Sequence, residues 1–117
     1  MITQRTKSLI LAIVLLATLI IVNVAVAECV RLYWNYTQGA DPATSFVIYR
    51  ASGSCNSNST FVFAGWVLAS QPTFTNYGVS PGETYCWQIT ARNVNGIESV
   101  PSNQIAKTIP TLSQGCS

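Results

Sequence analysis

The sequence beyond residue 27 predicts an all-β fold, a sandwich of six or seven short antiparallel strands. Short runs in which apolar and polar residues alternate, as they do in a strand with one buried face, recur along this part of the chain. Turn-forming Gly, Pro, Asn and Ser residues separate these runs. No stretch of useful length has the period of about 3.6 residues that marks an amphipathic helix. Many short strands with turns between them are typical of a sandwich or small barrel.

Four strands are expected in the first part of the domain, at residues 30–35, 46–49, 61–68 and 73–77. In the first of them apolar residues alternate with polar ones, which predicts one apolar face. The third is hydrophobic and β-prone but is interrupted by Gly65, which predicts a bulge or a crossing between sheets.

Two further strands are expected toward the C-terminus, at residues 84–92 and 104–109. A Ser-Pro-Gly turn precedes the longer strand, and Asn95-Gly96 is the strongest short hairpin signal in the chain. The residues that the alternation and packing place in the core are large and mostly aromatic: Trp34, Phe46, Ile48, Tyr85, Trp87 and Ile89.

The first 27 residues are expected to be a targeting segment rather than part of the domain, which would then span residues 28–117. Arg5 and Lys7 precede an uncharged apolar run from Leu9 to Ala27, and the small residues of Ala25-Val26-Ala27 suit a signal peptidase. The run is longer than the about 7–15 residues of a typical signal core. It also falls within the about 17–25 residues of a spanning helix, so a retained membrane anchor is the alternative. The protein is therefore expected outside the cytoplasm, secreted or anchored facing outward.

The charge pattern excludes nucleic acid as a partner. The chain has six basic and four acidic residues, and two of the basic residues, Arg5 and Lys7, lie in the targeting segment. The charges of residues 28–117 therefore cancel, which leaves no basic field for a polyanion. A membrane would be a partner only if the first segment stays attached.

All four cysteines lie in the part expected to be exported. An even number in a short exported domain predicts two disulfides. The chain has no histidine and no C-x-x-C motif, so we expect neither a metal site nor another cofactor.

Three stretches resemble the fibronectin type III family. Residues 30–36, VRLYWNY, resemble the family strand that carries a buried tryptophan, here Trp34. Residues 45–52, SFVIYRAS, are similar to the next strand. Residues 72–104, PTFTNYGVSPGETYCWQITARNVNGIESVPSNQ, are similar to the family's strand, Pro-Gly turn, tyrosine, long strand and Asn-Gly hairpin. The resemblance covers nearly all of residues 30–110 and implies an immunoglobulin-like sandwich.

The resemblance also implies roles in stability. Trp34 would be buried, and its truncation would cost about 3–5 kcal/mol. Tyr85 would form a tyrosine corner, in which its hydroxyl bonds to backbone a few residues upstream. The family begins with a strand A beside the strand of Trp34, but here only Glu28 and Cys29 precede Val30. Strand A is therefore expected to be missing, which leaves the edge of the Trp34 strand unpaired.

The family topology brings all four cysteines to one pole of the sandwich. It implies a Cys55–Cys86 pair, with Cys86 alternating outward on its strand, and a Cys29–Cys116 pair that ties the two ends together. Loop-entropy arithmetic gives upper estimates of about 3.7 and 4.6 kcal/mol for the stabilisation by these two bridges.

We do not expect an enzyme. General acid–base catalysis needs two positioned titratable groups, and Glu83 alone among the carboxylates lies near another motif. No serine has a neighbouring base that would activate it.

The function expected is a binding or adhesion module for an unknown protein or carbohydrate. The alternative is an assembly subunit that forms homo-oligomers through the open edge of the Trp34 strand. Outward aromatic side chains and the last hairpin are the candidate ligand contacts, although aromatic pairs on an ordinary sheet face explain the former equally: Tyr33, Tyr49, Tyr77, Trp66 and Asn95. Asn35 and Asn58 start N-glycosylation sequons.

Overall fold

The computed structural model describes residues 28–112 and residue 116, and within them it contains six strands and no helix. The strands are β1 (Cys29–Tyr33), β2 (Ser45–Ser52), β3 (Val62–Leu68), β4 (Thr73–Tyr77), β5 (Thr84–Arg92) and β6 (Ile105–Thr108). In this part of the chain no helix is long and apolar enough to cross a bilayer. The predicted targeting segment, residues 1–27, lies outside the described residues.

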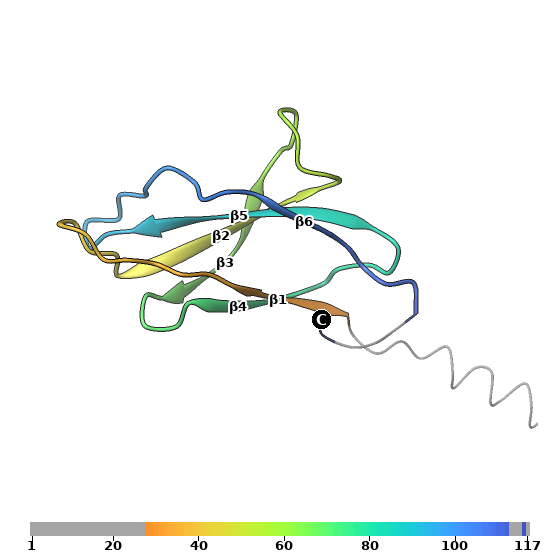
Figure 1. The fold of residues 1–117 in the computed structure, drawn as a ribbon, viewed down its shortest axis with the longest axis horizontal. Helices are drawn as coiled ribbons and strands as arrows, with labels where there is room; N and C mark the ends of the chain where they lie inside the picture. Colours follow the sequence, from red (N-terminus) through yellow and green to blue (C-terminus); the bar gives the residue numbers. More distant parts are fainter. Residues whose placement is uncertain (1–27, 113–115, 117) are drawn as a thin grey trace, which may run out of the picture.

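The strands form two antiparallel sheets, which confirms the predicted all-β sandwich. β1 pairs with β4 in one sheet, and the other sheet has the order β3-β2-β5-β6. Figure 1 shows β1 and β4 as one layer against the layer of the other four strands. β4 and β5 have the predicted bounds, whereas β2 continues three residues further, to Ser52, because it pairs with β5 along its whole length.

β3 contains the irregularity that Gly65 predicts, a bulge. The register shifts between Ile48, which pairs with Gly65, and Tyr49, which pairs with Phe63. A Cβ atom on Gly65 would lie 2.6 Å from ring atoms of Phe74 on β4. The glycine therefore lets an aromatic ring of the opposite sheet pack directly against the β3 backbone.

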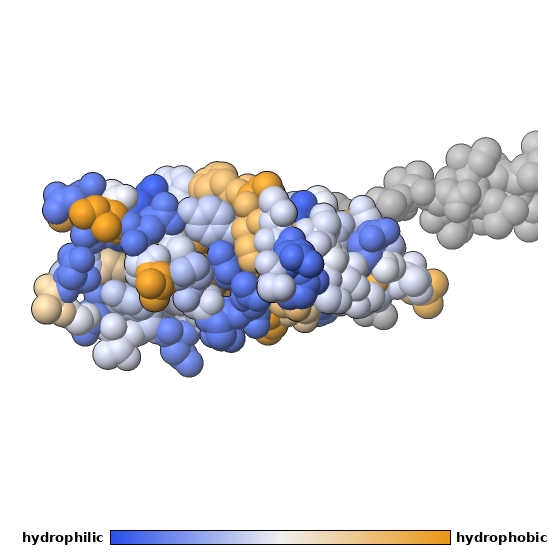
Figure 2. All heavy atoms as spheres, turned by 90° about the horizontal axis from the view of Figure 1, so that it is seen from above, coloured by the Kyte–Doolittle hydropathy of each residue, from blue (hydrophilic) through white to orange (hydrophobic). Residues whose placement is uncertain are grey.

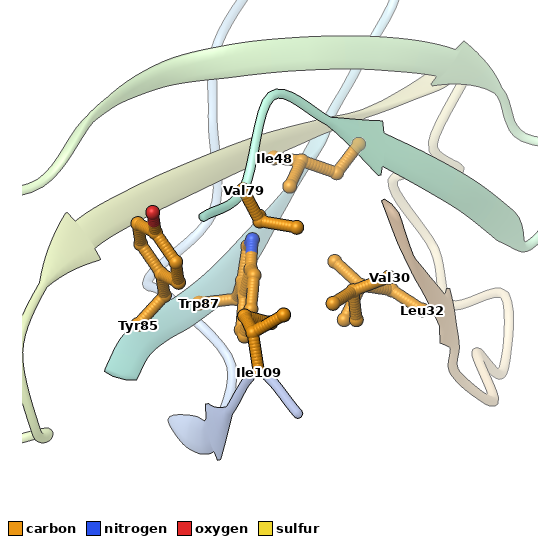
Figure 3. Close-up of a cluster of buried hydrophobic side chains, with 7 residues drawn as sticks. All are labelled: Val30, Leu32, Ile48, Val79, Tyr85, Trp87 and Ile109. Atoms are coloured by element: carbon orange, nitrogen blue, oxygen red, sulfur yellow. The ribbon is translucent and has the colours of Figure 1, made fainter. Parts of the chain in front are cut away.

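The hydrophobic core lies between the sheets, and its central side chain is Trp87. In Figure 3 this indole stands between Tyr85 and the pair Val30 and Leu32, with Ile109 beside it. The full buried cluster consists of Val30, Leu32, Ile48, Val79, Tyr85, Trp87 and Ile109, and Trp34 and Ile89 are partly buried against it. Phe46 is buried as well, so the predicted core residues lie in or against the core.

The prediction that Trp34 is the buried tryptophan of the fold was wrong in degree. Trp34 lies just beyond β1 and is only partly buried, whereas Trp87 is fully buried. Among the described residues no strand lies beside β1 over Trp34, so one side of the indole has no neighbouring strand.

Two polar arrangements join the sheets within this core. The Tyr85 hydroxyl accepts a hydrogen bond of 2.9 Å from the backbone N–H of Ser80, which is the predicted tyrosine corner. The buried Asn76 on β4 accepts through Oδ1 from Trp87 Nε1 at 2.9 Å and from Arg50 Nη1 at 3.0 Å. The Arg50 guanidinium also lies 4.7 Å from the Tyr85 ring centroid, a cation–π contact. The sequence patterns did not predict the role of Asn76.

The predicted Asn-Gly hairpin is present, but it does not lead directly into β6. Gly96 has a positive φ of 82°, and Arg92 bridges to Glu98. The chain then runs along β5 without forming a strand. Ser99 and Ser102 accept backbone hydrogen bonds through Oγ from Ala91 and Ile89, at 2.9 and 3.0 Å. Along residues 99–104, serine hydroxyls thus accept β5 backbone hydrogen bonds that the carbonyls of a neighbouring strand would accept in a regular sheet.

The structure forms both disulfides that the family topology implies. Cys55 pairs with Cys86, with Cα atoms 5.2 Å apart, and Cys29 pairs with Cys116. Cys86 alternates outward on β5 as predicted, yet it is fully buried in the folded domain. Cys29 and Cys116 also form a parallel bridge at the start of β1.

Candidate functional site

A groove of about 640 Å³ lies between the two sheets, and we call it the β1 groove. One wall is β1 with the chain that follows it to Tyr36. The other wall is the segment 99–105, which runs into β6. Both walls can be followed in Figure 1. β4 pairs with one edge of β1. The groove lies at the other edge, where no described strand pairs with β1.

The groove is open because residues that face the core there are not covered. Ile105 is paired with Trp87 across β5 and β6, so both side chains point to the core side of their sheet. Trp87 is 1% exposed, but Ile105 is 57% exposed and lines the groove. Val100, on the same wall, is 86% exposed. The groove is therefore the uncovered margin of the hydrophobic core.

An aromatic cluster forms one end of the groove. The ring of Phe46 lies 5.3 Å from Trp34 and 5.0 Å from Tyr36, in edge-to-face geometry in both pairs. Such pairs fix the orientation of rings that packing alone would leave free. The cluster therefore gives the groove an apolar, aromatic lining.

Two polar features mark the groove. Trp34 Nε1 is buried and has no hydrogen-bond partner among the described residues. Because this nitrogen is buried, it is not accessible to a ligand in the groove. Of the described residues that line the groove, only Arg31 carries a charge. The groove thus offers one positive charge on an otherwise neutral surface.

The open edge of β1 also presents backbone groups. The Trp34 N–H donates to the carbonyl of Pro72 on the β4 side, at 3.3 Å. Alternate residues of a strand direct their N–H and C=O groups to opposite edges. The N–H and C=O groups of Arg31 and Tyr33 therefore point away from β4, toward the groove side, where no described strand pairs with them.

The structure does not bring the predicted ligand contacts together. Tyr33 and Tyr77 lie on the outer face of the two-stranded sheet, exposed by 71% and 64%, and the register places them near opposite ends of the β1–β4 pair. Tyr49 and Trp66 lie on the outer face of the other sheet, and the exposed Asn95 is in the last hairpin. Of these five residues, only Tyr33 lines the groove.

The hydroxyl of Tyr49 belongs to a small polar network rather than to an open aromatic site. Tyr49 Oη and Thr90 Oγ1 each donate to Glu98 Oε1 at 2.6 Å. These bonds, that of Thr90 first, lower the pKa of Glu98 below its ordinary value. The same contact with Glu98, together with burial, raises the pKa of Tyr49. The network ties the last hairpin to the outer face of the sheet.

Further apolar groups lie on the surface of β3. Val62, Phe63, Trp66 and Leu68 are all more than half exposed. Figure 2 shows a band of apolar groups that crosses the middle of one face, which is otherwise largely hydrophilic. Val62 also lines a hollow of about 320 Å³, beside Arg50 and Asn58.

Asn35 and Asn58 are both exposed, so both N-glycosylation sequons are accessible. Within residues 28–112 and 116 no three His, Cys, Asp or Glu side chains gather into a group that would hold a metal ion.

The sequence patterns missed the groove residues on the far wall. Val100 and Ile105 carry no motif. The useful signal was the short distance between the predicted targeting segment and the first strand. It predicted an open β1 edge, and an open edge beside a sandwich core exposes the residues that face it.

Comparisons with known proteins support the fold. No protein-family model matches the chain, and no curated protein matches it. Among solved structures, the twitchin kinase region from C. elegans, a chain that includes fibronectin type III and immunoglobulin segments, is similar with a TM-score of 0.60 and 21% sequence identity. The match covers 74% of this chain and 15% of that one. The chain therefore has a β-sandwich fold of the kind found in fibronectin type III and immunoglobulin domains.

Proposed function

We propose that this protein is an exported, non-catalytic binding module of the fibronectin type III kind that binds a protein partner in the β1 groove. The observation that carries the proposal is the exposure of core-facing side chains there, above all Ile105 beside the buried Trp87. A soluble domain that leaves part of its core open gains free energy when a partner covers it.

A protein partner suits the groove better than a carbohydrate. The side chains that are most open to a ligand there, Val100 and Ile105, are aliphatic, and the aromatic cluster around Phe46 is apolar. Apolar side chains of a polypeptide would bury against these residues, whereas sugar hydroxyls need more hydrogen-bonding groups.

Export is part of the proposal. Disulfides in a β-sandwich fit an extracellular protein, because such bonds persist in oxidising compartments. The apolar residues 9–27 would direct export, followed by release or by retention as an anchor.

A matched pair of variants tests the groove as the binding site. The full-length protein is immobilised and panned against a phage library of random linear dodecapeptides, and the selected phage are then applied to Val100→Asp and Val94→Asp. Both valines are more than 80% exposed, but only Val100 lines the groove. We expect Val94→Asp to retain the phage. We expect Val100→Asp to bind them at least about tenfold more weakly, since burial of a carboxylate against the partner is costly. Equal retention by both variants, or no enrichment on the wild type, would contradict the proposal.

The open edge of β1 supports a second candidate function, assembly with other copies of this chain. Edge strands with unpaired backbone groups are sites of strand addition. This candidate predicts a dimer or polymer that the Val100→Asp variant disrupts, which sedimentation at high concentration measures.

A further inference from the structure

We propose that the groove receives an extended strand of a partner protein, which pairs with β1 through Arg31 and Tyr33 and carries an acidic residue beside Arg31. This inference rests on the proposed function and specifies its partner by conformation and chemistry. It joins three features of one place in the fold: an open strand edge, an uncovered core margin and a lone positive charge.

The strand edge determines the backbone conformation of the partner. Arg31 and Tyr33 each present an N–H and a C=O to the groove side, with the spacing of alternate residues in a strand. An extended segment matches that spacing, since its own free groups repeat every second residue. A helix satisfies its backbone groups internally and would leave those of β1 unpaired. Among regular conformations, an extended strand alone fits the edge.

The groove determines the side chains of the partner. A strand added to β1 would point every second side chain toward the core margin, between β1 and the wall that holds Val100 and Ile105. Those side chains would be apolar.

Charge determines the residue on the other face of the added strand. Arg31 is exposed on the outer face of its sheet and is the one charged residue among the described groove residues. Directly opposed residues of opposite charge stabilise adjacent strands, and like charges destabilise them. The partner segment thus alternates apolar residues with polar ones and bears Asp or Glu at the position opposite Arg31.

The backbone pairing is tested with two variants at one position. Tyr33→Ala and Tyr33→Pro both remove the ring, but only the proline removes the N–H that points to the open edge. Proline is tolerated at edge positions whose N–H makes no ladder bond, so both variants should fold. Thermal unfolding of each variant checks this. The probe is a synthetic dodecapeptide selected on the wild-type full-length protein, and its Kd is measured by calorimetry.

We expect Tyr33→Pro to bind the peptide about tenfold more weakly than Tyr33→Ala, because one backbone hydrogen bond and its geometry are lost. Equal affinity of the two variants would overturn strand pairing. If Val100→Asp still weakened binding of that peptide, the proposed function would stand and only this inference would fail.

Amide hydrogen exchange distinguishes a partner strand from the other possible occupants of the edge. Exchange at Arg31 and Tyr33 should be fast in the protein without peptide and slow in the complex. Slow exchange without peptide would mean that the edge is already covered by the chain itself or by a second copy, and would overturn the inference.

The charge is tested with Arg31→Gln. We expect selected peptides to contain Asp or Glu, and Arg31→Gln to lower their affinity by a fewfold at low salt and less at high salt. Peptides without acidic residues, or affinities that ignore this substitution, would overturn the acidic partner residue.

Discussion

Replacement of Gly65 by alanine should destabilise the sandwich although it adds only one methyl group. The Cβ would lie 2.6 Å from two ring atoms of Phe74, whereas ordinary van der Waals contact begins near 3.4 Å. The φ of Gly65 is not positive, so the backbone conformation itself accepts alanine. The cost would come from the ring alone, which must move by about 0.8 Å, the difference between the two distances.

The magnitude follows from the place of Phe74 in the fold. Its ring is partly buried against the core cluster and lies across the space between the sheets. Overpacking of a well-packed core costs about 1–3 kcal/mol. A domain of this size loses about 4–8 °C in Tm for each kcal/mol.

Equilibrium denaturation with urea measures this change in the free energy of unfolding. Gly39→Ala is the matched control, because nothing lies within 4 Å of its Cβ position and it lies in an exposed loop. We expect Gly39→Ala to remain within about 0.5 kcal/mol of the wild type. Phe74→Leu should reduce the cost of Gly65→Ala in the double variant, since the smaller side chain leaves room. If Gly65→Ala unfolded at the wild-type urea concentration, the packing argument would be refuted.

Three further predictions concern the network and the crosslinks. Tyr85→Phe leaves a backbone N–H without its acceptor and should lower the free energy of unfolding, measured with urea, by about 1–3 kcal/mol. A change below about 0.5 kcal/mol would show that the tyrosine corner does not stabilise the fold. Loss of the Cys55–Cys86 bridge in the double alanine variant should cost at most about 3.7 kcal/mol, and an unchanged Tm would show that the bridge does not form. The pKa of Glu98 is lowered on folding, so its stabilising contribution is complete above the unfolded pKa and is lost as pH falls through the folded pKa. Thr90→Val should raise that pKa in an NMR titration, and an unchanged titration would contradict the hydrogen bond.

Local sequence patterns were sufficient to predict most strand positions, because each strand buries one face and so alternates apolar with polar residues. Alternation and turn residues placed β4 and β5 at their observed bounds, and the interruption at Gly65 marked the bulge. The end of β2 was missed because pairing with β5, a contact distant in sequence, extends it to Ser52.

The sequence by itself determined the β-sandwich class and the core-facing residues, because the period of two in side-chain direction is a local property of a strand. Only the tertiary structure decided which residues line the β1 groove: it left Trp34 partly open, placed Val100 and Ile105 across from β1, and distributed the outward tyrosines over both faces. The groove lies between segments far apart along the chain, and their approach depends on how the two sheets pack, which no local pattern records.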